Sequence, residues 1–251
     1  MKYILIHLFF LLGTCNVSND LLVQEFESRQ SVSPVDHSVF DNLLRTYVNQ
    51  EGLVDYQGWK KDKIKLDEYL VYLGNHKPSS SWDKKSTLAY YINLYNAAAV
   101  QLILENNMPE SIKDIGGTFN SVWNKEYISI KGEKYSLNDI EKGILLKMGD
   151  PRVHFAINCA SYSCPKLQNR AFTKDNLEEL MEKGAREFIN SSKNDISRDK
   201  VSLSKIFKWY KDDFTSKELG LIDYLNKYST VKINKNASID YKDYNWKLNK
   251  Q

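Results

Sequence analysis

Hydrophobic residues recur at helical spacing in the first part of the chain. A first helix is expected to begin at Ser33-Pro34, because Ser caps helices well and Pro suits the first helical position. Its apolar face consists of Phe40, Leu43, Leu44, Tyr47 and Val48. A second helix is expected to end at Gly74. Its apolar face consists of Leu66, Tyr69, Leu70 and Leu73. The pattern therefore predicts two amphipathic helices in this region.

The segment 88–104 differs because it carries hydrophobic residues on all sides. A helix without a polar face is expected to be buried at the centre of a domain. Asn93 and Asn96 interrupt the segment three residues apart, which places them on one side of the helix. Each needs partners, since an unmet buried polar group costs about 1–3 kcal/mol.

The second half of the chain mixes short strands with helices. Residues 126–136 alternate as in a hairpin around Gly132, and Ser136-Leu-Asn-Asp139 fits a capping box for a helix that ends at Gly149. Strands are expected at 153–158 and 201–203. Further helices are expected from Thr173 and from near Ser204. No repeat or linker divides residues 34–250, so we expect one α+β domain, a mostly helical body with a small β-sheet.

The N-terminus has the pattern of an export signal. Met1-Lys2-Tyr3 precedes an apolar run from Ile4 to Leu12, within the about 7–15 residues of a signal peptide and short of the about 20 that span a membrane. We expect a signal peptide over 1–15 and a flexible tether over 16–33. Leu12-Gly-Thr-Cys15 is also similar to a lipoprotein cleavage site, so lipidation of Cys15 and free secretion both stay open. The protein is expected to be exported, periplasmic or associated with the cell envelope.

Composition and charge limit the partners. The chain is 42% hydrophobic and 27% charged, which is typical of a folded protein. Its net charge of +3 is small, and lysines alternate with acids without forming a basic stripe. Nucleic acid is therefore not an expected partner. We expect a small-molecule or peptide-like ligand, and a membrane only through a lipid on Cys15.

The candidate chemistry is concentrated in residues 152–165. On the expected strand, His154 and Asn158 share one face, and the chain then enters Cys159-Ala-Ser-Tyr-Ser-Cys164-Pro165. Cysteine catalysis needs a thiolate, a base and a group that orients the base. Cys159 or Cys164 would be the nucleophile and His154 the base. The candidates for the orienting group are Asn96, Asn93 and Glu141.

Other interpretations of the same residues stay open. If Cys15 is removed or lipidated, two cysteines remain, and an exported pair usually forms a disulfide. A metal site at His154, Cys159 and Cys164 would lack a fourth ligand. His154 would also fit as an ordinary core histidine, and Arg152 as the ion-pair partner of Glu141. We expect no metal and no cofactor.

Several motifs together resemble a known family. They are Leu88-Ala-Tyr-Tyr-Ile-Asn-Leu-Tyr-Asn-Ala97, Ser136-Leu-Asn-Asp-Ile-Glu141, the stretch from Arg152 to Pro165, Trp209-Tyr-Lys-Asp-Asp-Phe214 and Tyr244-Asn-Trp-Lys-Leu-Asn249. In this order they look like the motifs of the domain-of-unknown-function 547 family. The resemblance implies a single domain and no specific activity. It marks as motif positions Asn93, Asn96, Glu141, Arg152, His154, Cys159 and Cys164.

Two functions follow from these residues. The first hypothesis is a thiol-dependent acyl hydrolase or transferase of the cell envelope, with Cys159 as nucleophile, His154 as base and Asn96 as the orienting residue. The second is a non-catalytic binding module in which a Cys159–Cys164 disulfide fixes a loop beside a polar pocket formed by Asn93, Asn96 and His154. The residues expected to bind the ligand are Asn93, Glu141, Arg152, Asn158, Ser161 and Cys164.

Overall fold

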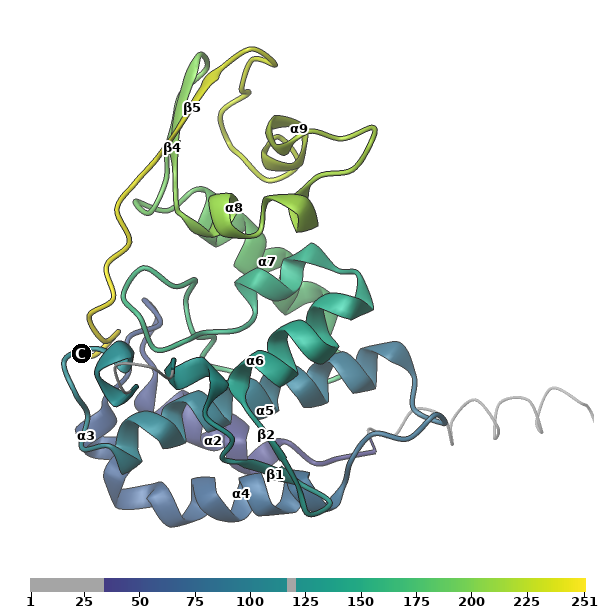
Figure 1. The fold of residues 1–251 in the computed structure, drawn as a ribbon, viewed down its shortest axis with the longest axis vertical. Helices are drawn as coiled ribbons and strands as arrows, with labels where there is room; N and C mark the ends of the chain where they lie inside the picture. The colour runs from purple at the N-terminus through teal and green to yellow at the C-terminus, as the bar shows by residue number, and fades with distance from the viewer. Residues whose placement is uncertain (1–33, 117–120) are drawn as a thin grey trace, which may run out of the picture. The chain divides into compact units, whose positions relative to one another are not determined.

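The computed structural model describes residues 34–116 and 121–251, and these form the elements labelled in Figure 1. The helices are α2 (Ser38–Tyr47), α3 (Tyr56–Trp59), α4 (Lys63–Asn75), α5 (Lys84–Glu105), α6 (Leu137–Ile140), α7 (Leu177–Ile189), α8 (Ile206–Trp209) and α9 (Leu221–Leu225). The strands are β1 (Ile128–Ile130), β2 (Glu133–Tyr135), β3 (Asp195–Ile196), β4 (Lys200–Leu203) and β5 (Ser238–Tyr241). Short 3-10 helices are η1 (Lys60–Asp62), η2 (Ile112–Ile115), η3 (Val122–Asn124), η5 (Leu146–Met148), η6 (Pro151–Phe155) and η7 (Lys211–Phe214), and η4 (Glu141–Leu145) is a π-helical turn. Helices with two small sheets confirm the expected α+β class.

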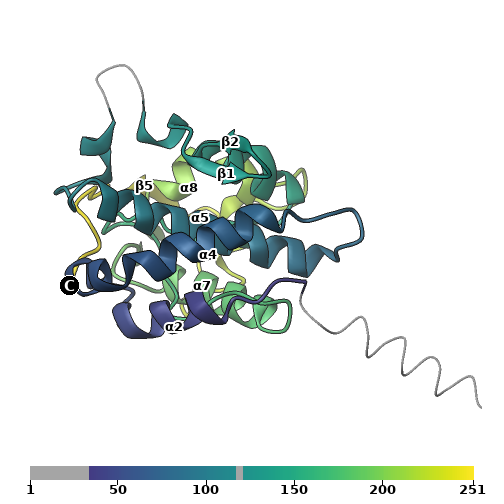
Figure 2. The same cartoon turned by 90° about the horizontal axis from the view of Figure 1, so that it is seen from below.

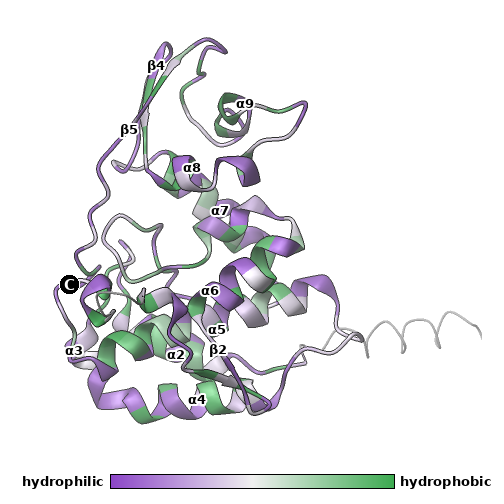
Figure 3. Ribbon diagram, in the orientation of Figure 1, coloured by the Kyte–Doolittle hydropathy of each residue, from purple (hydrophilic) through white to green (hydrophobic). Residues whose placement is uncertain are grey.

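Helix α5 is the central element, as its sequence predicts. Seventeen of its 22 residues are buried, so it has no solvent-exposed face. It contacts α3, α4, α6 and η4, and Figure 2 shows it crossing the middle of the unit formed by residues 34–251. The helix begins where the Asp83 side chain accepts a hydrogen bond of 2.8 Å from the Ser86 N–H. Figure 3 shows the contrast with α4, along which hydrophilic and hydrophobic residues alternate.

Three expected helix boundaries are wrong, and one of them is the start expected at Thr173, because α7 begins at Leu177. Helix α2 begins at Ser38 rather than at Pro34, because the Asp36 carboxylate accepts the Ser38 N–H at 2.8 Å and so satisfies an N-terminal donor there. Helix α4 continues through Gly74 to Asn75. A Cβ atom at Gly74 would lie 2.3 Å from the Ser129 carbonyl oxygen, so this glycine allows the hairpin to approach the helix closely.

The hairpin and the helical run after it agree with the prediction. Strands β1 and β2 pair antiparallel, and the turn residues Lys131 (φ 51°) and Gly132 (φ 84°) are both left-handed, as a type I′ turn requires. Ser136 then forms the expected capping box with Asp139. The run continues through α6, η4 and η5, and left-handed Gly149 ends it.

The strand expected at 153–158 is wrong, because residues 151–155 form the 3-10 helix η6. The Asp150 side chain accepts the Arg152 N–H at 2.9 Å, and Pro151 occupies the first turn. Asp followed by Pro is a strong helix start, and it outweighs the weak alternation that suggested a strand.

A second part of the hydrophobic core lies in the C-terminal half of the chain. Helix α7 packs against η6, and the Phe155 ring lies 5.5 Å from the Phe188 ring and 5.7 Å from the Phe214 ring. Beyond it, β4 pairs antiparallel with β3 and parallel with β5, and β4 confirms the expected strand at 201–203. Figure 1 shows β4, β5 and α9 at the end of this unit farthest from α4.

After β5 the chain returns to the α3 end of the unit (Figure 1). The Val54 N–H donates to the Asn249 carbonyl at 2.8 Å, and the Gln251 N–H donates to the Val54 carbonyl at 3.0 Å. The last residues are therefore held in place, next to the loop that carries the cysteines.

The membrane-related predictions concern residues that the structure leaves undescribed. The expected signal peptide, Cys15 and the tether all lie before Pro34, outside the described residues. Among the helices of the described ranges, none combines the length and the apolar character needed to cross a membrane.

Buried His37 predicts a specific loss of stability in acid. Its Nδ1 lies 2.6 Å from the Tyr69 hydroxyl, and burial lowers the pKa of His37 from 6.5 to about 4 against the opposing effect of Asp36. Between these pH values the unfolded histidine binds a proton and the folded one does not. The free energy of unfolding should therefore fall by about 3 kcal/mol as the pH falls from 6.5 to 4. Denaturant titrations of wild type and His37→Gln should show their difference shrinking over this window, and parallel curves would contradict the assignment.

Candidate functional site

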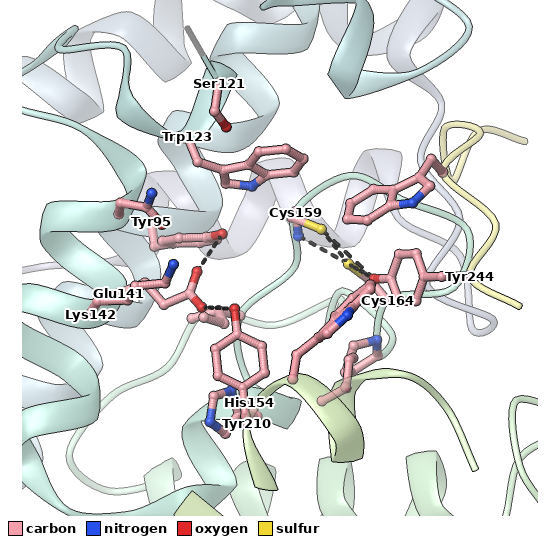
Figure 4. A pocket seen from close by; sticks show the side chains of 16 residues that line it. Tyr95, Ser121, Trp123, Glu141, Lys142, His154, Cys159, Cys164, Tyr210 and Tyr244 are labelled. Carbon is pink, nitrogen blue, oxygen red and sulfur yellow. Dashed lines mark hydrogen bonds between the residues drawn. The ribbon is translucent and has the colours of Figure 1, made fainter. Parts of the chain in front are cut away.

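A cavity of about 240 Å³ lies where the run 137–148, the cysteine loop (residues 159–164) and the C-terminal segment (residues 244–250) meet (Figure 4). Its lining residues are Tyr95, Ser121, Trp123, Asn138, Glu141, Lys142, His154, Ile157, Cys159, Cys164, Pro165, Ile206, Trp209, Tyr210, Tyr244 and Trp246. Of the predicted site residues, the cavity brings together Glu141, His154, Cys159 and Cys164. The other predicted residues, Asn93, Asn96, Arg152, Asn158 and Ser161, do not line it.

The cysteine loop is held in a tight turn by Asn158. The Asn158 Oδ1 accepts the Ala160 N–H at 2.7 Å, and its Nδ2 donates to the Pro165 carbonyl at 2.7 Å. Ala160 adopts a left-handed conformation (φ 60°), which reverses the chain direction. Ser161 is fully buried in this turn, with its Oγ 3.5 Å from the Cys159 Sγ. Asn158 and Ser161 therefore shape the loop rather than line the cavity.

The turn brings the two sulfurs of the loop together. The Cys159 Sγ lies 2.7 Å from the Cys164 Sγ, and both residues are free thiols. A disulfide bond is shorter, at about 2.05 Å. Cys159 is half-buried and Cys164 is buried. The pair is therefore close enough to exchange between a dithiol and a disulfide with little movement, and the disulfide itself stays a prediction.

Hydrogen bonds favour a thiolate on Cys164. Burial alone would raise the pKa of the Cys164 thiol, but donors around it outweigh burial and lower this pKa to about 7. They include the Cys159 thiol, the Tyr244 hydroxyl at 3.2 Å and the Cys159 N–H at 3.3 Å. The hydrogen bond to Cys164, together with burial, raises the pKa of Cys159 well above its usual range. The pair therefore loses its first proton near neutral pH and its second only at much higher pH.

The C-terminal segment clamps the cysteine loop. The Tyr162 N–H donates to the Lys247 carbonyl at 2.7 Å, and the Asn249 N–H donates to the Ala160 carbonyl at 3.0 Å. The Asn245 N–H donates to the Ser163 Oγ at 2.9 Å. These bonds fix the position of Tyr244, whose hydroxyl reaches Cys164.

Glu141 forms an acidic wall of the cavity. It is 5% exposed and begins the π turn η4, a local widening of the helix that often occurs at functional sites. Its Oε1 accepts from the Tyr210 hydroxyl at 2.6 Å and its Oε2 from the Tyr95 hydroxyl at 3.2 Å. Burial, together with this carboxylate, raises the pKa of both tyrosines far above their usual range, so they remain protonated donors. Figure 4 shows Glu141 and the sulfurs on different sides of the pocket.

His154 is paired with Asp213 rather than with a cysteine. Its Nε2 lies 2.8 Å from the Asp213 Oδ2, and its ring packs 4.2 Å from the Tyr210 ring. Burial lowers the pKa of His154 despite the opposing effect of Asp213, so the imidazole is neutral near pH 7. No hydrogen bond joins His154 to a sulfur in the described part of the chain. The sequence offered Asp213 only as part of the motif Trp209-Tyr-Lys-Asp-Asp-Phe214.

Asn93 and Asn96 hold backbone segments and do not orient His154, contrary to the prediction for Asn96. Asn93 bonds both polar groups of Phe172, the carbonyl at 2.7 Å and the N–H at 2.9 Å. Asn96 donates to the Ala156 carbonyl at 3.0 Å and accepts the Asn158 N–H at 2.9 Å. Backbone groups that enter the core without regular pairing need such partners. The two amides thus fasten loops to α5.

Arg152 also differs from expectation, because its partner is not Glu141. Its guanidinium lies 2.7 Å from Asp150 and 2.9 Å from Glu178. The Asp150 hydrogen bond raises the pKa of Arg152 above its usual value, and the pair fixes the start of η6. Arg152 thus stabilises the fold near the site without lining the cavity.

An aromatic wall, formed by Trp123, Trp209, Tyr244 and Trp246, was not predicted. Ring centroids are 5.4 Å apart for Trp123 and Trp246, 5.7 Å for Trp209 and Trp246, and 4.5 Å for Tyr244 and Trp246. Trp209 is 47% exposed, so nearly half of this residue of the wall is open to solvent. The available signal was the placement of Trp209, Tyr244 and Trp246 in two of the motifs, whereas Trp123 lies in none of them. Their helical or loop context gave no distance between the rings.

The donor set offers no metal site in residues 34–116 and 121–251. No group of three or more His, Cys, Asp or Glu side chains within these ranges is placed to hold a metal ion. The polar groups around the cavity are thiols, phenols, one carboxylate and the His154 imidazole, together with the side chains of Ser121, Asn138 and Lys142. Thiols, a carboxylate and an imidazole are suited to nucleophilic and proton-transfer chemistry.

Comparison with protein families gives one match. Residues 79–189 match the family model described as "Protein of unknown function, DUF547", which confirms the resemblance found in the motifs. The matched range contains Glu141, His154 and both cysteines of the loop, whereas Trp209, Tyr210, Asp213 and the C-terminal segment lie beyond it. No curated protein and no solved structure matches the chain.

Proposed function

Because the chain belongs to the DUF547 family, whose description assigns no activity, we propose its function from the site: thiol–disulfide exchange by the Cys159–Cys164 pair. One observation carries the proposal, namely two free sulfurs 2.7 Å apart on the wall of a cavity. The thiolate is the nucleophile in such exchange, and the hydrogen bonds to Cys164 favour a thiolate there. Cys164, rather than Cys159, is therefore the attacking residue.

The proposed exchange consists of two successive displacement steps at sulfur. The Cys164 thiolate attacks one sulfur of a substrate disulfide, the substrate S–S bond breaks, and one substrate thiolate leaves and takes a proton from solvent. Cys159 then loses its proton and attacks the Cys164 sulfur of the mixed disulfide, which releases the second substrate thiol. The substrate gains two electrons and the cysteine pair becomes a disulfide. A second dithiol reverses these steps and restores the pair.

A redox titration tests the proposal. The protein would be equilibrated in glutathione buffers of graded potential and alkylated, and its free thiols would be counted by intact mass. We expect a single two-electron transition between about −270 and −120 mV, the range of exchange catalysts. A transition below about −300 mV would instead indicate a structural disulfide and favour a non-catalytic binding module.

The second candidate is the thiol-dependent acyl hydrolase or transferase. It is favoured by His154, which lines the same cavity as the Cys164 thiol and forms with Asp213 a pair that has the form of a base with its orienting group. In this case Asp213 replaces Asn96 as the orienting residue. Cysteines that stay reduced in the most oxidising buffer would support this candidate and exclude exchange.

We also propose that the protein acts after export, in the periplasm or cell envelope. The support is the charged start, apolar run and small-residue exit of residues 1–15. An oxidising compartment would set the exchange toward forming disulfides in substrates. Fractionation of cells, with the N-terminal mass of the mature protein, would distinguish lipidated Cys15 from a cleaved, freely secreted form.

A further inference from the structure

Glu141 is a buried carboxylate without a cationic partner. Both of its oxygens accept from tyrosine hydroxyls, and no lysine or arginine of residues 34–116 and 121–251 forms an ion pair with it. Buried carboxylates are normally paired with a cation, because hydrogen bonds alone do not replace the hydration of the charge. Two tyrosines leave part of the acceptor capacity of the carboxylate available to a further donor.

The other charges around the cavity do not supply that cation. The sulfur pair adds negative charge once Cys164 ionises. His154 is neutral and already bonded to Asp213. Lys142 lines the cavity, but it is exposed to solvent. The interior of the cavity is therefore acidic.

The aromatic wall is suited to the same kind of ligand. The negative faces of Trp and Tyr rings attract ammonium groups, and pockets of several such rings bind organic cations. Lys113 illustrates this, because its Nζ lies 5.2 Å from the centroid of the Trp246 ring. The wall also presents the partly exposed ring of Trp209 to an arriving ligand.

We propose that the cavity binds a primary ammonium group of the substrate between the Glu141 carboxylate and the aromatic wall. This inference rests on the proposed exchange reaction. It identifies the substrates as disulfides that carry an amine close to the sulfur. A neutral or anionic disulfide would leave the carboxylate without a partner.

Cystamine and its uncharged analogue bis(2-hydroxyethyl) disulfide provide matched probes. Binding of both would be measured by calorimetry on the full chain carrying Cys15→Ser, Cys159→Ser and Cys164→Ser, so that no exchange takes place. We expect cystamine to bind at least about ten-fold more tightly, the size of effect that a buried charge pair with aromatic contacts supports. Glu141→Gln in this background should reduce the preference to within about two-fold, because the amide keeps the shape but not the charge.

Two further variants complete the test. Lys142→Gln removes an exposed positive charge at the cavity and should strengthen cystamine binding about two- to three-fold without touching the core. Glu133→Gln, a surface glutamate in the β1–β2 hairpin, is the matched control and should change nothing. Equal affinity for the two probes, or a preference that survives Glu141→Gln, would overturn the ammonium site.

The outcomes separate this inference from the exchange reaction. Selective cystamine binding by the cysteine-free variant, with no redox transition in the wild type, would retain the ammonium site and reject the exchange. Turnover of both disulfides, in proportion to their uncatalysed rates, would retain the exchange and reject the ammonium site.

Discussion

Replacing Cys159 by serine is expected to trap the protein as a mixed disulfide on Cys164 when oxidised glutathione is added. Without Cys159 no second thiol attacks the intermediate, so the protein should gain the mass of one glutathione and turnover should fall to background. Replacing Cys164 by serine should also reduce turnover to background, but without accumulation of an adduct. The Cys159 thiol, whose pKa is raised well above its usual range, is a poor nucleophile at neutral pH.

Intact mass and the rate of glutathione release measure both effects. Cys15→Ser is the matched control, since it makes the same substitution outside the described residues and should leave turnover unchanged. Accumulation of the adduct on Cys164→Ser rather than on Cys159→Ser would reverse the assigned roles. It would restore Cys159 as the nucleophile, as the sequence suggested.

Asn96→Ala is expected to reduce the free energy of unfolding by about 3 kcal/mol, because it leaves two buried backbone groups without partners at roughly 1–3 kcal/mol each. The groups are the Ala156 carbonyl and the Asn158 N–H, which hold the chain just before the cysteine loop. Chemical denaturation of wild type and variant measures the loss. Loosening of the loop should also raise the pKa of Cys164, which the pH dependence of its alkylation reports.

Asn106→Ala gives the control at the end of the same helix. The Asn106 Nδ2 donates to the Leu102 carbonyl at 2.8 Å, and its side chain is only half-buried. Because water can replace this hydrogen bond, Asn106→Ala should reduce the free energy of unfolding by less than about 1 kcal/mol. Equal losses in the two variants would mean that Asn96 does not carry the role assigned to it.

The two asparagines of α5 show which features of a residue a local sequence pattern predicts and which it does not. Their burial follows from the absence of a polar face around them, and so does their need for partners. Their partners do not follow, since Asn96 bonds residues 60 and 62 positions away along the chain. The two asparagines consequently attach backbone segments to α5 and do not form the polar pocket that was expected around them.

At the cysteines, too, the local sequence predicts part of the arrangement and distant residues determine the rest. The spacing of Cys159 and Cys164 allows the sulfurs to meet, but the lowered pKa of Cys164 depends on Tyr244, 80 residues further along. His154 was correctly singled out as a site residue, while its partner Asp213 lies 59 positions away. Residue type at one position carries no information about which of many distant donors will face it.

By itself the sequence determined the α+β class, the buried helix α5, the β1–β2 hairpin, the Ser136 capping box and the family. These features depend on periodicity, caps and turn residues, which act over a few neighbouring positions. The 3-10 helix η6 also has a local cause, the Asp150-Pro151 start, which the prediction of a strand from alternation overlooked. Only the tertiary structure decided the His154–Asp213 pair, the tyrosines on Glu141 and the aromatic wall. These three depend on contacts between segments far apart in the chain, which form only when the whole domain packs.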